Sequence, residues 1–206
     1  MFVRLSRCNL SCPSCDTPYT WDWSRFDVAA ETRRLPATDI LDWVLAASPE
    51  LVVVTGGEPL LQQSLLVPLV TALRAAGRRV EVETNGTLVP LPALAEAVAG
   101  FNVSPKLGGF AAVEDGGRRI NPEALRALVA TGRAVFKFVV DDQDDVRELS
   151  QLQWELQLAP IWVMPQGQDP QSVLEGTRWL AEVALVHGWN LTTRLHVLVW
   201  GDMRGR

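Results

Sequence analysis

The residues best suited to chemistry are three cysteines in one short window. Cys8, Cys12 and Cys15 are the only cysteines among the 206 residues, and they stand in a CxxxCxxC pattern. Cubane iron–sulfur clusters are bound by cysteine thiolates, usually four. Three thiolates would leave one iron without a protein ligand and open to a small molecule. The spacing therefore predicts a 4Fe-4S cluster with one coordination position reserved for a ligand.

Two other uses of these cysteines fit the sequence less well. A structural zinc ion needs four ligands, commonly three cysteines and a histidine, and both histidines, His187 and His196, lie far downstream of the cysteines. A disulfide framework is typical of short secreted domains with an even number of cysteines, and no signal peptide opens this chain. Reduced cysteines indicate the cytoplasm.

Length and composition predict a single domain over residues 1–206. Hydrophobic residues make up 48% and charged residues 21%, as in ordinary globular proteins. The net charge is −5 without a long basic run, so we expect no nucleic-acid partner. The longest apolar runs, such as residues 51–54, are too short to cross a bilayer, so we expect no membrane partner.

Short β-branched segments alternate with longer helical segments along the chain. This alternation predicts repeated βαβ units and a mainly parallel sheet, in which ligands lie beyond the carboxyl ends of the strands. The expected strands are Phe2–Leu5, Leu51–Val54, Val80–Glu83, Phe101–Val103, Ala134–Val140, Ile161–Val163 and Thr192–Leu198. The expected helices lie near 37–47, 61–76, 91–99, 121–131, 143–153 and 171–187.

Four motifs with ligand-binding character follow expected strands. In the first, Thr55–Pro59, the glycines Gly56 and Gly57 allow the backbone to approach a ligand closely. Glu58 then offers a carboxylate that suits a ligand ammonium group, such as the amino group of S-adenosylmethionine (SAM). Taken alone, this motif is equally compatible with an ordinary turn.

The other three motifs are also compatible with turns when each is considered alone. Glu83–Thr87 contains an Asn-Gly pair, and its side chains would face the same pocket mouth as Glu58. Ser104–Lys106 offers a hydroxyl and a cation for a carboxylate or a ribose. Met164–Gly167 could contact an adenine through its backbone and Gln166. Together, behind one cysteine loop, the four motifs predict a ligand site.

Residues next to the cysteines allow two interpretations. The Thr17 hydroxyl could cap a helix or coordinate a hard cation such as Mg²⁺, and the chemistry by itself favours the cap. Trp21 and Trp23 are expected to pack around the cysteine loop, which would shelter a cluster from solvent.

At this point the motifs resemble those of a known family. The patterns F-V-R-L-x-x-C-N-L-x-C-x-x-C-D-T, T-G-G-E-P, E-T-N-G-T, S-P-K, M-P-Q-G and R-L-H-V-L-V-W-G-D are similar to the 7-carboxy-7-deazaguanine synthases, and the similarity covers essentially the whole chain. These are radical SAM enzymes of queuosine and deazapurine biosynthesis. The resemblance implies a partial, open (β/α) barrel with a mainly parallel sheet.

The resemblance also implies roles for individual residues. Cys8, Cys12 and Cys15 would ligate the 4Fe-4S cluster, and Thr17 would bind Mg²⁺, against the preference for a cap. Arg4 and Thr55 would contact the substrate, 6-carboxy-5,6,7,8-tetrahydropterin. The residues that would lie against SAM are Ser14, Cys15, Asp16, Gly57, Ser104, Pro105, Lys106, Met164, Pro165, Gln166 and Gly167.

The activity implied by the resemblance is conversion of the pterin to 7-carboxy-7-deazaguanine with loss of ammonia. One electron passes through the reduced cluster to SAM, and the resulting 5′-deoxyadenosyl radical abstracts hydrogen from C6 of the pterin. The cofactor performs the difficult chemistry, so no side chain is assigned a catalytic role. The implied partners are a low-potential electron donor such as a flavodoxin and a second copy of the chain, in a homodimer.

One departure from the family keeps two alternatives open. The family normally has a segment with a Q-G-E-G-type motif before F-V-R-L, whereas this sequence begins at Met1–Phe2. A glycyl-radical activase would share CxxxCxxC and G-G-E-P without needing Cys-Asp-Thr. A truncated copy would hold a cluster without turnover.

Overall fold

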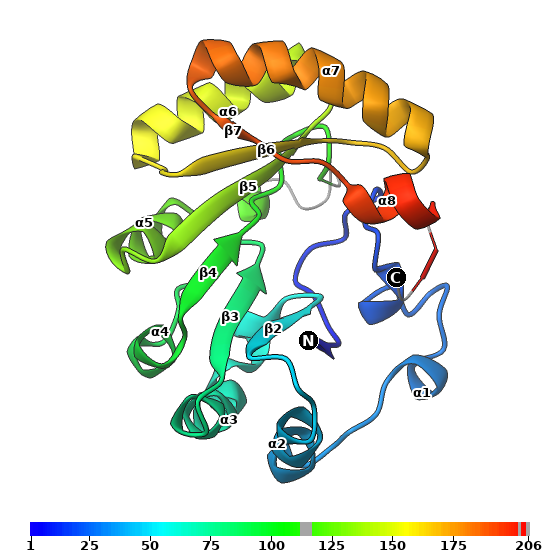
Figure 1. Ribbon diagram of the computed structural model, residues 1–206. Helices are drawn as coiled ribbons and strands as arrows, with labels where there is room; N and C mark the ends of the chain where they lie inside the picture. Colours follow the sequence, from blue (N-terminus) through cyan, green and yellow to red (C-terminus); the bar gives the residue numbers. More distant parts are fainter. Residues whose placement is uncertain (112–116, 202, 205–206) are drawn as a thin grey trace.

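The computed structural model has one parallel sheet whose strands follow one another in chain order (Figure 1). It describes residues 1–111, 117–201 and 203–204. Each strand pairs in parallel with the next, and β1 and β7 form the two edges. The strands are β1 (Phe2–Leu5), β2 (Leu51–Gly56), β3 (Arg79–Thr84), β4 (Gly100–Val103), β5 (Ala134–Val140), β6 (Ile161–Pro165) and β7 (Asn190–Leu191).

Helices cover the outer side of the curved sheet (Figure 1). Because β1 does not pair with β7, the sheet stays open, and the prediction of a partial barrel is confirmed. The α-helices are α1 (Val28–Glu31), α2 (Ala37–Leu45), α3 (Gln63–Ala75), α4 (Pro92–Ala97), α5 (Pro122–Ala130), α6 (Gln143–Leu156), α7 (Pro170–His187) and α8 (Leu195–Trp200). The 3₁₀ helices η1 (Pro18–Thr20) and η2 (Pro59–Gln62) lie near the cysteines and after β2.

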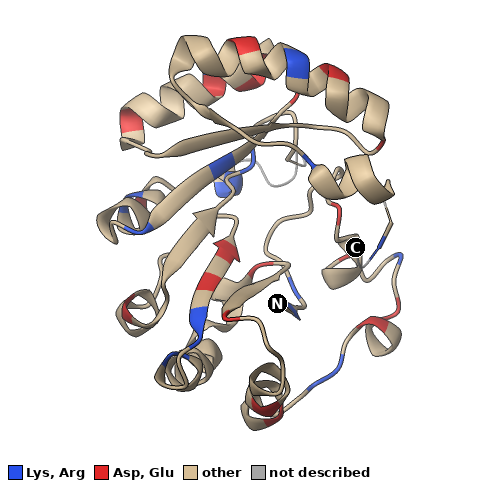
Figure 2. Cartoon of the chain, in the orientation of Figure 1, with Lys and Arg blue, Asp and Glu red and all other residues tan. Residues whose placement is uncertain are grey.

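The two faces of the sheet differ in character because side chains alternate along each strand. In β3, Val80 and Val82 are buried against the helices, whereas Glu81 and Glu83 between them are only partly buried. In β5, Phe136 and Phe138 are fully buried, and Lys137 lies on the opposite, concave face. Charged positions on β3 and β5 are visible in Figure 2. The outer face therefore stabilises the fold, and the concave face is free to bind polar ligands.

The expected strand Thr192–Leu198 is wrong. The last strand is only Asn190–Leu191, and residues Leu195–Trp200 form the helix α8. Alternating apolar residues in R-L-H-V-L-V suggested a strand, but Arg194 and Val197 are the buried positions. Residues three apart lie on the same side of a helix. Burial of this side against the rest of the protein therefore favours a helix over a strand here.

The other six expected strands and all six expected helices are present, with boundaries shifted by a few residues. The short helices η1 and α1 after the cysteines were not expected from the sequence. Among the described residues, no helix is long and apolar enough to cross a membrane.

Candidate active site

The cysteines lie in a loop over residues 6–20, which follows the carboxyl end of β1. We call it the cysteine loop. Arg7 enters it with a positive φ of 80°, a backbone conformation that costs energy in a residue other than glycine. Two backbone hydrogen bonds hold Arg7 there: its amide donates to the Thr20 carbonyl at 2.6 Å, and its carbonyl accepts from the Glu58 amide at 2.8 Å. These bonds fix the direction in which Cys8 leaves the sheet.

Two glycines at the end of β2 allow the cysteine loop to approach closely. A Cβ atom on Gly56 would lie 2.0 Å from the Leu5 carbonyl oxygen, and Gly56 also has a φ of +145°. A Cβ atom on Gly57 would lie 2.1 Å from the Arg7 carbonyl oxygen and 3.0 Å from the Cys8 Cβ. Of the glycine pair expected to face a ligand, Gly56 is therefore packed against the end of β1 and Gly57 against the cysteine loop.

The Glu58 carboxylate holds the ends of β2 and β3 together. It is 0% exposed. One oxygen, Oε1, accepts from the Leu60 amide at 2.9 Å and the Thr84 hydroxyl at 2.8 Å. The other oxygen, Oε2, accepts from the Asn85 amide at 2.7 Å. Burial raises the pKa of Glu58, while these three hydrogen bonds oppose that effect.

The Glu58 side chain interacts with the protein itself. Both oxygens accept hydrogen bonds from the protein, and no part of the side chain reaches solvent. Glu58 thus positions the end of β2, and its pairing with a ligand ammonium group stays a prediction. A lone T-G-G-E-P motif cannot reveal this network, because two of the three donors, Thr84 and Asn85, come from the end of β3.

The Glu83–Thr87 motif is also mainly part of the framework. Thr84, Asn85 and Thr87 are buried, contrary to the expectation that they face the pocket mouth with Glu58. The Asn85 side-chain amide donates to the Asn9 side-chain oxygen at 3.0 Å and lies 3.9 Å from the Cys8 sulfur. Asn9 in turn donates to the Thr87 hydroxyl at 2.8 Å. The end of β3 therefore anchors the middle of the cysteine loop.

The three cysteines fit the donor set of an iron–sulfur cluster. None of the three forms a disulfide; Cys12 is buried, and Cys8 and Cys15 are partly exposed. Within the described part of the chain, no three His, Cys, Asp or Glu side chains gather closely enough to hold a single metal ion. A single zinc ion would need such a group, whereas a cubane cluster takes each thiolate on a different iron.

Burial raises the pKa of the Cys8 thiol above its ordinary value. The negative charges of Glu58 and Cys15 add to this effect, whereas the Leu10 backbone amide and the positive charge of Lys106 oppose it. Metal ligation requires the thiolate, so cluster binding must supply the energy to remove this proton.

Thr17 and Trp21 flank Cys15. Thr17 stands at the N-cap of η1 but makes no side-chain cap hydrogen bond, so the capping interpretation is wrong. Its hydroxyl lies 3.7 Å from the Cys15 sulfur. The Trp21 indole donates toward the same sulfur at 3.4 Å, as expected for an aromatic residue packed on the cysteine loop. Trp23, by contrast, is 36% exposed.

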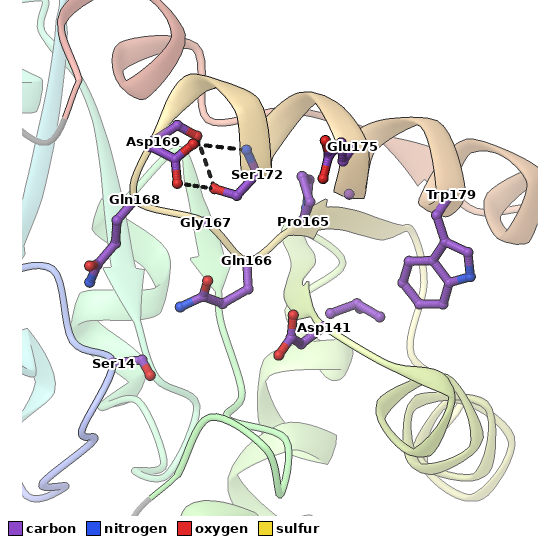
Figure 3. A pocket seen from close by; sticks show the side chains of 12 residues that line it. Ser14, Asp141, Pro165, Gln166, Gly167, Gln168, Asp169, Ser172, Glu175 and Trp179 are labelled. Carbon is purple, nitrogen blue, oxygen red and sulfur yellow. Dashed lines mark hydrogen bonds between the residues drawn. The ribbon is translucent and has the colours of Figure 1, made fainter.

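A cavity of about 590 Å³ opens at the carboxyl ends of β5 and β6, beside the cysteine loop (Figure 3). This volume suits a small organic ligand. Four residues expected to contact SAM line it: Ser14, Pro165, Gln166 and Gly167. Gly167 has a φ of +157°, and a Cβ there would lie 2.8 Å from the Val173 side chain, so glycine is needed where the strand turns into α7. Met164 does not line the cavity.

Lys106 stands at the carboxyl end of β4, on the cluster side of the sheet. Its ammonium group donates to the Ser104 hydroxyl at 2.9 Å and lies 5.1 Å from the centre of the Phe110 ring. Its charge lowers the pKa values of both Cys8 and Glu58. Ser104 and Lys106 therefore place a hydroxyl and a cation near the cysteine loop, although neither lines the cavity described above.

The two expected substrate residues lie side by side on the concave face. Arg4 of β1 is in register with Thr55 of β2. The Thr55 hydroxyl donates to Glu83 of β3 at 2.8 Å. The sequence interpretation did not assign Glu83 to the substrate site, although the alternating pattern R-V-E-V-E-T placed it on the same face as Glu81.

Comparison with known proteins identifies the family. Residues 3–124 match the Radical SAM superfamily. The chain is 36% identical to a 7-carboxy-7-deazaguanine synthase from Pyrobaculum aerophilum, over 100% of this chain and 88% of that protein. It is 37% identical to one from Hyperthermus butylicus, over 97% of this chain and 83% of that protein. The chain belongs to the 7-carboxy-7-deazaguanine synthase family of radical SAM enzymes.

Solved structures show the same fold. The crystal structure of QueE from Escherichia coli matches with a TM-score of 0.67 at 24% identity, over 94% of this chain and 84% of that one. The crystal structure of SuiB from Streptococcus suis matches with a TM-score of 0.64 at 14% identity, over 97% of this chain and 50% of that one. Membership of the radical SAM family supports a 4Fe-4S cluster and SAM as the cofactors, which fits the three cysteine thiols.

Replacing Cys12 tests the ligand assignment. We expect Cys12→Ala to lose the cluster iron after anaerobic reconstitution, because the chain has no spare cysteine to take its place. Iron and sulfide analysis is the measurement. Ser14→Ala, which keeps all three thiols, is the control and should retain iron. Full iron and sulfide in Cys12→Ala would show that this thiol is not a ligand.

Gly57→Ala tests the close approach of β2 to the cysteine loop. The added methyl group cannot fit 2.1 Å from the Arg7 carbonyl oxygen, so the loop must move and iron incorporation should fall strongly. Gly117→Ala is a matched control, because nothing lies within 4 Å of its added Cβ. Equal iron content in the two variants would contradict the steric argument.

Glu58→Gln tests the buried carboxylate. The glutamine NH₂ group would have to face a hydrogen-bond donor at the end of β2 or β3, which costs about 1–3 kcal/mol of unfolding free energy. Urea denaturation of the cluster-free protein measures this cost, with the exposed Glu50→Gln as control. If the two variants are equally stable, the Glu58 network does not stabilise the fold.

Proposed function

We propose that the protein converts 6-carboxy-5,6,7,8-tetrahydropterin to 7-carboxy-7-deazaguanine with loss of ammonia. The observation that carries this proposal is the conjunction of three cysteine thiols in one anchored loop with similarity to the synthase family over the whole of this chain. The adjacent Arg4 and Thr55 on the concave face support a polar substrate beside that loop. These similarities do not favour either alternative from the sequence analysis, the glycyl-radical activase or the truncated copy that holds a cluster without turnover.

The protein's contribution is to position two small molecules and to exclude water. SAM bound to the cluster supplies a 5′-deoxyadenosyl radical, the reagent that starts the ring contraction. Cys8, Cys12 and Cys15 would hold the cluster. Pro165, Gln166 and Gly167 would hold the adenosyl part in the cavity, where Gln166 points inward (Figure 3). Ser14, which lines the same cavity from the cysteine loop, would lie between them.

Four further expected SAM contacts stay part of the proposal. Asp16, Ser104, Pro105 and Lys106 stand at or near the cysteine loop, and the Lys106 ammonium group suits a carboxylate. The backbone of Gly57 lies beside Cys8.

Arg4 and Thr55 would bind the pterin on the concave face of β1 and β2. No hydrogen bond or ion pair of the described residues occupies the exposed Arg4 side chain, so its planar group is available to a carboxylate or a ring carbonyl. Thr55 donates to Glu83, which leaves the hydroxyl oxygen free to accept a hydrogen bond from the substrate.

An anaerobic turnover assay tests the proposed function. It contains the reconstituted protein, SAM, a low-potential reductant, Mg²⁺ and 6-carboxytetrahydropterin, and the products are detected by mass spectrometry. We expect 7-carboxy-7-deazaguanine together with 5′-deoxyadenosine and methionine. Formation of 5′-deoxyadenosine without the deazapurine would overturn the substrate assignment and leave only the radical SAM chemistry.

We propose that Thr17 binds the Mg²⁺ that the family resemblance implies. Its hydroxyl makes no cap hydrogen bond and lies beside Cys15, and hydroxyl oxygen is a suitable ligand for this hard cation. Thr17→Ala should therefore weaken the Mg²⁺ dependence of turnover while iron content stays unchanged. Thr17→Ser, which keeps the hydroxyl, is the control. Identical Mg²⁺ titrations for the wild type and Thr17→Ala would remove Thr17 from the metal site.

The electron donor, the homodimer and the cytoplasmic location remain proposals. Cys8 and Cys15 are partly exposed, which supports electron entry from a low-potential protein such as a flavodoxin. Trp154 of α6 and Leu185 and Val186 of α7 are each at least 79% exposed, and such apolar side chains support an interface. Light scattering coupled to size-exclusion chromatography distinguishes a dimer from a monomer.

A further inference from the structure

Arg194 is a buried arginine whose charge the protein itself only partly satisfies. The residue is 8% exposed. Its guanidinium group donates to one acceptor, the Asp16 carboxylate, at a long distance of 3.4 Å. Its Nε–H is buried without any hydrogen-bond partner among the described residues. Asp16 offers little compensation, because its side chain is 53% exposed and well solvated.

A second arginine shows what a structural arginine looks like in this protein. Arg78 also has a buried Nε–H without a partner. Its guanidinium nevertheless donates to four backbone carbonyls between α2 and β2, at Leu45, Ala47, Ser48 and Pro49. Among the residues that the structure describes, Arg194 has no comparable set of acceptors. A buried, permanently charged group is costly without compensation, so the position of Arg194 points to a role in binding an anion.

The position of Arg194 identifies where that anion would bind. The last sheet hydrogen bond of this segment runs from the Thr192 amide to the Val163 carbonyl, two residues before Arg194. Arg194 therefore leaves the sheet at the carboxyl edge, where the ligand-binding motifs also lie. It contacts Asp16 across the open side of the barrel, between the ends of β7 and β1. Asp16 stands between Cys15 and Thr17, so the anion would lie next to the proposed cluster and Mg²⁺ sites.

We propose that Arg194 binds a carboxylate of a ligand at this edge. The planar guanidinium group matches a carboxylate in a two-pronged hydrogen bond, and the unpartnered Nε–H is one of the donors for it. The contact with Asp16 holds the guanidinium in place without using its donors fully. The inference rests on the proposed function, which supplies two such carboxylates: the methionyl carboxylate of SAM and the 6-carboxylate of the pterin.

The experiment measures ligand binding to reconstituted, anaerobic protein, so it does not depend on turnover. Equilibrium dialysis gives the affinity for SAM alone, and then for 6-carboxytetrahydropterin in the presence of SAM. Arg194→Ala should retain its iron and sulfide but bind one of the two ligands about 10- to 100-fold more weakly, the loss expected for a charge-assisted hydrogen bond. Arg178→Ala, which removes an exposed arginine from α7, is the matched control and should bind both ligands normally.

The two sources of the carboxylate give different results. Weaker SAM binding assigns Arg194 to the methionyl carboxylate. Unchanged SAM binding with weaker pterin binding assigns it to the 6-carboxylate, and a tetrahydropterin without that group should then bind equally to the wild type and to Arg194→Ala. Arg194→Lys keeps the charge without the planar fork, so it should lose part of the affinity. This variant tests the proposal even if Arg194→Ala does not fold.

Two results would overturn the proposal. Normal affinity of Arg194→Ala for both ligands would show that no ligand carboxylate lies there. Loss of iron in both Arg194→Ala and Arg194→Lys would show that the residue only ties Asp16 and the cysteine loop to α8. If the wild-type protein neither binds nor converts the pterin, the proposed function fails, and SAM affinity alone decides the role of Arg194.

Discussion

The site depends on one buried carboxylate. Glu58 is inaccessible to solvent, and its two oxygens accept three hydrogen bonds that join the ends of β2 and β3. Its own amide donates to Arg7, the residue just before the first cysteine. Because burying a carboxylate is costly unless hydrogen bonds compensate for it, the donors must lie in fixed positions. The hydrogen bonds of the Glu58 carboxylate therefore hold two strand ends together, and the hydrogen bond from its amide fixes the start of the cysteine loop beside them.

The cysteine loop is short of internal structure, so it takes its shape from its neighbours. Gln62 donates to the Ser6 carbonyl at 2.9 Å, and Asn85 and Thr87 contact Asn9. Gly57 allows the β2 end to lie against Arg7 and Cys8. Such preorganisation would favour binding of a cluster that has only three thiolate ligands. The cysteine loop already has a fixed conformation, so it would lose little conformational entropy when the cluster binds. Residues of the motifs at β2 and β3 thus also hold the cysteine loop in place, in addition to the ligand contacts proposed for Thr55 and Gly57.

The open barrel brings residues from both ends of the chain to one edge. Parallel strands in chain order place every carboxyl end on the same side, so residues separated by long stretches of sequence lie near one another. The contact between Arg194 and Asp16 joins β7 to β1 across the unpaired side of the sheet. If Arg194 takes a ligand carboxylate, then the binding of that ligand also links the two edges of the open barrel.

The sequence by itself determined the features that depend on local pattern and residue type. The CxxxCxxC spacing, the alternation of strands with helices, and the polar motifs at strand ends were enough to predict a cluster, a mainly parallel sheet and a ligand edge, and the family resemblance added the open barrel. Gly56 and Gly57 also predicted a close backbone approach, although the sequence did not show that the end of β1 and the cysteine loop are what approach them.

Only the tertiary structure decided what depends on partners distant in the chain. Glu58 has a positioning role because two of its donors, Thr84 and Asn85, come from the end of another strand. The segment Leu195–Trp200 became a helix because burial of Arg194 and Val197 outweighed a local alternating pattern. The sequence around Arg194 gave no sign of its role, because neither its burial nor its incomplete set of hydrogen-bond acceptors can be predicted from the neighbouring residues. Local propensity acts over a few residues, whereas burial and hydrogen-bond compensation are set by the whole fold.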